Sequence, residues 1–138
     1  MIRPVLLTLL LAAGVPAVAA AHDAAGRTVC NPEGSQLELN ACAADELAQA
    51  DAELNAVWRE VLAKADSTVA RDKLKAAQRL WIQLRDADLA AQFPLAPGQD
   101  PRVEYGSMYP MSFASTKAGL TRQRTAWLRA TFLEDVGY

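Results

Sequence analysis

The stretch from Gln36 to Ala65, which contains neither proline nor glycine, most constrains what this chain can fold into. Its apolar residues recur at alternating steps of three and four: Leu47, Ala50, Leu54, Val57 and Val61. This spacing is typical of a helix that buries one stripe of its surface, and Trp58 and Leu62 widen that stripe. We therefore predict a long helix over residues 36–65, with Ser35 as its N-cap.

A second amphipathic segment runs from about Thr68 to Gln92. Its apolar positions again step by four and three: Ala70, Leu74, Ala77, Trp81 and Leu84. Pro94 ends the segment, because the residue before a proline avoids helical geometry. The connection to the first helix is only the DST sequence at residues 66–68, which predicts an antiparallel helical hairpin.

Residues 94–107 hold three prolines and two glycines and show no periodicity, so they are predicted to be a long loop. A third helix is predicted from Ser107 or Met108 to about Leu133, with Ser107 as its cap and Pro110 in its first turn. Its buried stripe is predicted to comprise Phe113, Leu120, Trp127 and Leu128. The fold class is therefore all-α, an antiparallel up-down-up three-helix bundle with a long loop between its second and third helices.

The first residues have the features of an export signal. Arg3 is followed by the apolar run VLLTLLLAAGVPAVAAA, which ends in small residues at Ala19 and Ala21. Gly14 and Pro16 interrupt this run, which argues against a permanent membrane span. We predict that residues 1–21 are a cleaved signal peptide and that residues 22–138 form a single domain.

Cys30 and Cys42 are the two cysteines of the chain. In an exported protein they are expected to pair as a disulfide that ties the N-terminal arm to the first helix. A zinc site would need two further ligands, and the single histidine, His22, lies at the new N-terminus. We therefore predict one disulfide and no metal site.

Charged residues interrupt the predicted inner faces of all three helices. Asp51 and Arg124 are expected to lie at the same level of the bundle and to pair, with Arg85 or Asp88 serving the opposite end. An unpaired charge at such a position would be costly, whereas a paired one can fix helix register. We favour this structural interpretation over a catalytic carboxylate site.

Composition and motifs argue against several function classes. Lys and Arg total 14 against 16 Asp and Glu, which is not the basic surface that binds nucleic acid. The chain has no glycine-rich phosphate loop, no nucleophile elbow and no cluster of metal ligands. A serine–histidine site is disfavoured because His22 stands alone. The sequence therefore predicts a protein that is not an enzyme and needs no cofactor.

Three blocks of sequence resemble the LprI-type lysozyme-inhibitor domain. They are NACAADELAQADAELNAVW in the first helix, LKAAQRLWIQLRDADL in the second and GSMYPMSFASTKAGLTRQRTAWL in the third. The resemblance covers about residues 30–130, with the blocks in the family's order. It implies a small, disulfide-containing helical domain exported by bacteria. The best-known member of this family is a surface lipoprotein that inhibits lysozyme, and many relatives have no established role.

This chain departs from the family pattern at two points. Family members often carry a second cysteine pair, and Leu89 and Thr116 stand at the positions that match it. Because both cysteines are absent together, packing is expected to replace that bridge. The chain also lacks a lipid-attachment cysteine after its signal peptide. We therefore expect a periplasmic or secreted protein without a membrane anchor.

The resemblance implies a protein partner, namely lysozyme or another peptidoglycan hydrolase. Eight acidic residues between 31 and 66 are candidates for steering toward a cationic lysozyme: Glu33, Glu38, Asp45, Glu46, Asp51, Glu53, Glu60 and Asp66. For filling a groove lined by carboxylic acids, the candidates are Arg102, Tyr105, Ser107 and Tyr109. A solvated acidic face, a helix start that docks on the core and a homodimer contact at the two tyrosines are the alternative interpretations. The rival function is a non-enzymatic adaptor or immunity-like module of the envelope with another protein partner.

Overall fold

The structure, a computed structural model, describes residues 30–134. Within this range the chain is helical and contains no strand, with three long helices: α1 (Gln36–Lys64), α2 (Thr68–Gln92) and α4 (Tyr109–Phe132). Two short elements, α3 (Pro101–Tyr105) and the 3₁₀ helix η1 (Gly106–Met108), lie between α2 and α4. The all-α prediction is confirmed. The predicted signal peptide and His22 lie outside the described residues.

Serine residues cap the N-termini of both α1 and α2. The Glu38 amide donates to the Ser35 hydroxyl, and the Glu38 carboxylate accepts from the Ser35 amide at 2.7 Å, a reciprocal capping box. The Ser35 hydroxyl also donates to the Glu38 carboxylate at 2.7 Å, and this bond together with the one from the Ser35 amide lowers the pKa of Glu38. Ser67 caps α2 by accepting from the Ala70 amide at 3.1 Å. The predicted cap of α1 and the bounds of α2 are therefore confirmed.

The predicted loop over residues 94–107 is only partly irregular. Asp100 caps α3 by accepting from the Arg102 amide at 2.7 Å, and Pro101 occupies the first turn, where its missing N–H costs nothing. Gly106 then takes a positive φ of 71°, which favours glycine, where α3 gives way to η1. The sequence prediction missed this short helix.

The third long helix begins later than the sequence indicated. Met108 is the N-cap of α4 and makes no side-chain cap hydrogen bond, so the prediction that Ser107 caps this helix is wrong. The turn of η1 precedes α4 directly, and Asn40 of α1 donates to the Ser107 carbonyl at 3.1 Å. Pro110 lies in the first turn of α4, as predicted.

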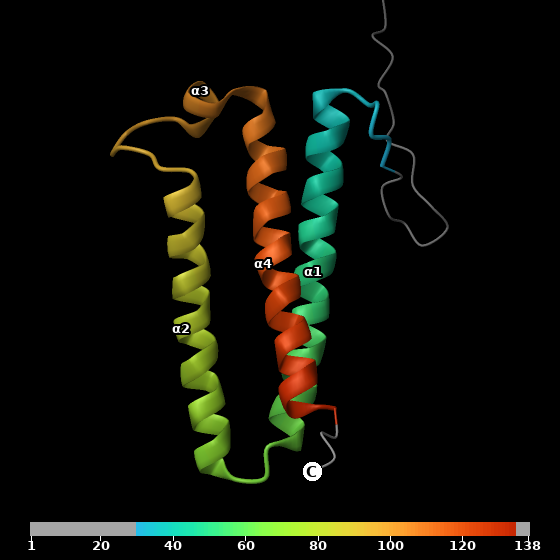
Figure 1. Cartoon of the computed structure of the whole chain (residues 1–138), viewed down its shortest axis with the longest axis vertical. Helices are drawn as coiled ribbons and strands as arrows, with labels where there is room; N and C mark the ends of the chain where they lie inside the picture. Colours follow the sequence, from blue (N-terminus) through green and yellow to red (C-terminus); the bar gives the residue numbers. More distant parts are fainter. Residues whose placement is uncertain (1–29, 135–138) are drawn as a thin grey trace, which may run out of the picture.

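The core is a narrow seam between α1 and α4, which lie side by side along their lengths (Figure 1). We define the α1–α4 seam by its buried residues: Cys42, Ala43, Ala50, Leu54, Val57 and Val61 of α1, and Ala114, Ala118, Thr121, Thr125 and Leu128 of α4. Most of these side chains are small, so the two backbones can approach closely. The buried stripe of α4 is thus displaced by about one residue from the predicted stripe. Of the four residues predicted to be buried on this helix, only Leu128 is buried.

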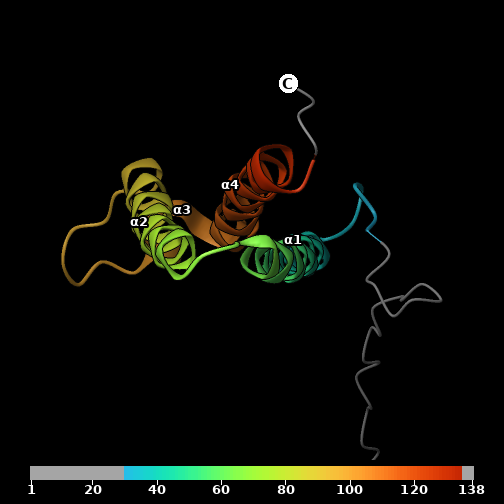
Figure 2. The ribbon, with the colours of Figure 1, turned by 90° about the horizontal axis from the view of Figure 1, so that it is seen from below.

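Helix α2 packs less closely than the other two long helices. It lies beside α4, and Leu89 is its one buried residue (Figures 1 and 2). Leu84, predicted to face inward, is 59% exposed, whereas Trp81 packs against the core and Leu89 is buried. The structure thus supports three long helices but not a closed three-helix core, and the antiparallel bundle stays a prediction.

The disulfide prediction is confirmed. Cys30 and Cys42 are bonded, with their Cα atoms 5.6 Å apart. Cys42 lies in the second turn of α1 and is buried in the seam, so the bridge fastens the preceding arm to this helix.

Among residues 30–134, no helix combines the length and the apolar character that spanning a membrane requires.

Candidate partner-binding surface

Four aromatic rings cluster where α2 ends and α4 begins. Phe93 lies edge-on to Tyr105 and Tyr109, with ring centroids 5.8 and 5.6 Å away. The two tyrosine rings stack on each other at 5.7 Å, and Phe113 completes the group at 5.5 Å from Tyr109. Such ring pairs stabilise beyond the area they bury. The cluster thus joins the end of α2, the short helix α3 and the start of α4.

The hydroxyl group of Tyr105 is used within the molecule. It donates to the Pro94 carbonyl at 2.7 Å, which closes the connection between α2 and α3. The side chain is 37% exposed, so one edge of the ring remains at the surface. Tyr105 therefore holds its own loop in shape, and its hydroxyl is engaged there rather than available to a partner's carboxylate.

Arg102 and Ser107 are the other two predicted contact residues. Both are exposed, and within residues 30–134 neither side chain has a hydrogen bond or ion pair. Arg102 borders an open depression of about 670 Å³ that Tyr109, Pro110 and Phe113 also line. The predicted contact residues thus lie at one end of the molecule, with two of them building the scaffold and two exposed on it.

The acidic face of α1 is partly neutralised by α4. Arg129 donates to Glu53 at 2.7 Å, and Arg122 lies 3.9 Å from Glu46. Glu38 is occupied in the capping box. These surface pairs contribute little to stability, but they reduce the negative charge that this face presents to a partner. The steering charge is therefore smaller than the count of acids suggests.

The predicted pair between Asp51 and Arg124 is absent from the described residues. Arg124 instead donates through Nε to Gln78 of α2 at 3.0 Å, and its guanidinium lies 4.5 Å from the Trp127 ring and 5.7 Å from Trp81. The reason is its position on α4, one residue before Thr125 of the seam, which turns it toward α2. Burial lowers the pKa of Arg124.

Arg85 and Asp88 do not form the expected second pair either. Arg85 is mostly buried, lies 5.2 Å from the Trp81 ring and pairs with its neighbour Asp86 at 2.8 Å. Asp88 is exposed and belongs to no ion pair in the described range. The two arginines thus lie against the Trp81 ring instead of forming the predicted pairs with Asp51 and Asp88.

The sequence prediction missed Gln78, Trp81 and Trp127 as partners of these arginines. A usable signal was present in the spacing. Arg85 follows Trp81 by four residues and Trp127 follows Arg124 by three, so each pair lies on one face of its own helix.

Residues 30–134 hold no group of three or more His, Cys, Asp or Glu placed to bind a metal ion.

Comparison with known proteins identifies the family of this chain. Residues 29–128 match the family described as lysozyme inhibitor LprI. An uncharacterized protein of Rhizobium meliloti (strain 1021) is 40% identical over 112 residues, which cover 72% of this chain and 76% of the relative. No solved structure matches the chain. Since the match extends over most of the sequence, the chain belongs to the LprI lysozyme-inhibitor family.

Proposed function

We propose that this protein is exported and that it binds and inhibits a lysozyme or a related peptidoglycan hydrolase. The observation that carries the proposal is the family match over residues 29–128, which spans α1, α2 and nearly all of α4. Inhibition would proceed by protein–protein contact, without bond chemistry. The disulfide and the absence of a membrane-spanning helix within residues 30–134 are compatible with a periplasmic or secreted location.

The exposed end formed by α3 and η1 is the proposed contact surface. A lysozyme cleft works with two carboxylic groups, so a guanidinium is a complementary group to place there. Arg102 supplies that cation, and Ser107 supplies a hydroxyl nearby in sequence. Tyr105 and Tyr109 would act indirectly, because their packed rings hold α3 in one conformation and so reduce the entropy lost on binding.

The acidic residues in and beside α1 would act before contact. Glu33, Glu60 and Asp66 are exposed and form no ion pair in the described range. Such charges attract a cationic lysozyme and raise the association rate more than the final affinity. Their effect should weaken as the salt concentration rises.

A turbidity assay tests the proposal. Purified residues 22–138 are added to hen-type, goose-type and invertebrate-type lysozymes, and the clearing of a bacterial cell-wall suspension is followed. We expect inhibition of at least one type that saturates near one inhibitor per enzyme. Incubation with peptidoglycan alone should release no product, because the proposed action is contact rather than hydrolysis.

Matched arginine variants locate the surface. Arg102→Ala should raise the concentration needed for half inhibition about tenfold, because a charged hydrogen-bonding group is lost from the contact. Arg79→Ala removes another exposed arginine, from the middle of α2, and should leave inhibition unchanged. Equal inhibition by both variants would exclude the α3 end as the contact surface.

Failure against all three lysozyme types would favour the second function, an envelope adaptor or immunity-like module with another protein partner. A pull-down from periplasmic extract with residues 22–138 as bait would then identify that partner.

A further inference from the structure

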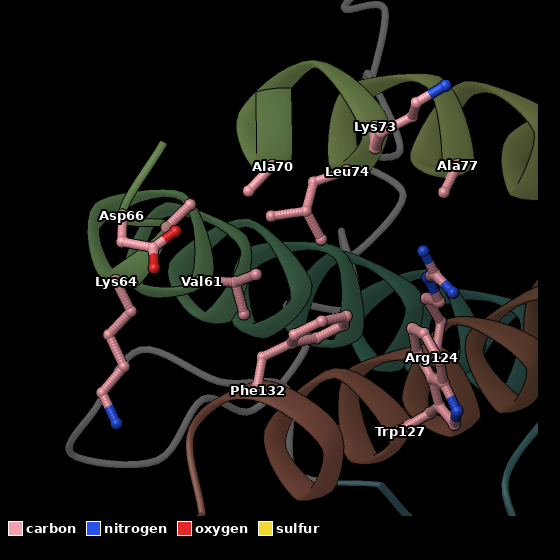
Figure 3. Close-up of a pocket in the computed structure, with 11 residues that line it drawn as sticks. Val61, Lys64, Asp66, Ala70, Lys73, Leu74, Ala77, Arg124, Trp127 and Phe132 are labelled. Atoms are coloured by element: carbon pink, nitrogen blue, oxygen red, sulfur yellow. The ribbon is translucent and has the colours of Figure 1, made fainter. Parts of the chain in front are cut away.

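A cavity of about 520 Å³ opens at the end of the helices opposite α3, between the last turns of α1 and α4 and the first half of α2 (Figure 3). Its walls are mainly apolar: Val61, Ala70, Leu74, Ala77, Trp127 and Phe132. This volume lies within the range of sites that bind small organic molecules. The cavity is distinct from the surface proposed to contact lysozyme.

Side-chain size explains why the helices leave this space. On α2 the lining includes Ala70 and Ala77, which are too short to reach the facing rings of α4. Trp127 and Phe132 pack edge to face on each other at 5.5 Å and remain 48% and 38% exposed. Leaving such apolar surface in contact with water is unfavourable, so an apolar occupant would gain free energy here.

Arg124 adds a single well-placed cation to the cavity. Its guanidinium is held against the Trp127 ring and by the Nε hydrogen bond to Gln78. Figure 3 shows this group at one end of the cavity, directed toward α2. Neither Nη atom has a hydrogen-bond partner within residues 30–134, and no carboxylate of that range pairs with it. An arginine stays charged even when partly desolvated, so this one lacks a counter-ion.

The other charged residues of the lining define how a ligand would lie. Lys64 donates to the Leu133 carbonyl at 2.9 Å, and Lys73 extends away from the cavity in Figure 3. Asp66 lies at the end opposite Arg124. An anionic group is therefore favoured at the Arg124 end, and a second negative charge near Asp66 is disfavoured.

We propose that this cavity binds a small amphipathic carboxylate with one negative charge. Its apolar body, alkyl or aryl, lies between Leu74 and Phe132, and its carboxylate accepts hydrogen bonds from the two Nη groups of Arg124. Bidentate pairing of this kind is the arrangement that arginine and carboxylate favour. The binding site does not depend on whether the protein inhibits lysozyme.

Titration with ligands that share a ten-carbon alkyl tail but differ in head group tests the proposal. Residues 22–138 are titrated with decanoate, 1-decanol and decyltrimethylammonium below their aggregation concentrations, and amide shifts are followed by NMR. We expect saturable binding of decanoate, at least tenfold tighter than of the other two, with shifts at residues 61–77 and 124–132. Indole-3-acetate is a carboxylate with an aromatic apolar part, and its affinity relative to decanoate shows whether the cavity prefers an aryl or an alkyl group. Equal affinities for all three decyl ligands, or no saturable binding of either carboxylate, would overturn the proposal.

Variants then locate the two halves of the site. Arg124→Gln should weaken decanoate binding about tenfold, whereas Arg122→Gln, which removes an exposed arginine paired with Glu46, should leave it unchanged. Ala70→Phe fills the apolar part without altering Arg124 and should abolish binding. Wild-type affinity in a folded Ala70→Phe variant would place the ligand elsewhere. Arg102→Ala should bind decanoate normally, which separates this test from the inhibition assay.

Discussion

Ala118 and Thr121 of α4 are completely buried, whereas Leu80 and Leu84 of α2 are 66% and 59% exposed. Among these four residues the larger and more apolar side chains lie outside, and the smaller ones are buried in the seam. Hydrophobicity alone does not decide burial here, because two helices that approach closely along their lengths exclude water most completely where side chains are short. α2 contacts the rest of the molecule through a few groups, among them Leu74 and Trp81, which pack against the core, and the buried Leu89.

Truncating one leucine in the α1–α4 seam and one on the exposed face of α2 is the strongest test of this difference in packing. Leu128→Ala should lower the free energy of unfolding by about 3 kcal/mol, because it leaves a cavity at a fully buried position of the seam. Leu80→Ala, the same change on the exposed face of α2, should cost less than about 0.5 kcal/mol. Urea denaturation followed by circular dichroism measures both. Similar losses for the two variants would mean that α2 is packed as tightly as α4.

Removing the disulfide has the next largest expected effect. The paired change Cys30→Ser with Cys42→Ala should lower the free energy of unfolding by up to about 3 kcal/mol, because the bridge restricts the unfolded chain. The bridge belongs to the seam side of the molecule, and α2 has no such restraint. Thermal unfolding with and without a reducing agent measures this on the wild-type chain, and the double variant should be insensitive to the reductant. An unchanged melting temperature after complete reduction would contradict it.

The smallest expected effect lies within the seam itself. The buried Thr121 hydroxyl has no hydrogen-bond partner in the described part of the chain, whereas the Thr125 hydroxyl donates to the Thr121 carbonyl at 3.0 Å. Thr121→Val should therefore raise the free energy of unfolding by about 1 kcal/mol, since it removes an unsatisfied polar group. Thr125→Val should bring no such gain. Denaturation midpoints distinguish the two, and a loss of stability in Thr121→Val would show that its hydroxyl is satisfied in solution.

Local signals in the sequence predicted most of the helical segments. Ser35 with Glu38, and Ser67 before α2, mark helix starts through hydrogen bonds that involve only neighbouring residues. The helix α3 was missed although Asp100 and Pro101 form a usual helix start, because five residues are too few to show periodicity. Where structure depends on adjacent residues, the sequence was sufficient.

The buried face of α4 was harder to predict for a physical reason. Phe113, Leu120 and Trp127 repeat with the same period as Ala114, Thr121 and Leu128, one position along. Ranking by apolarity favours the first set, but α1 packs on the second, whose small residues permit a closer approach. The same displacement turned Arg124 away from Asp51 and toward Trp81, Gln78 and the cavity.

Residue type and spacing along the chain were enough to predict the helical class, the bounds of α2, the disulfide and the family. The buried face of each helix, the partners of the inner charges and the position of the cavity became known only from the packing of the helices. Those features depend on how closely two helix surfaces pack against each other, and a periodic pattern of apolar residues is compatible with several packing arrangements.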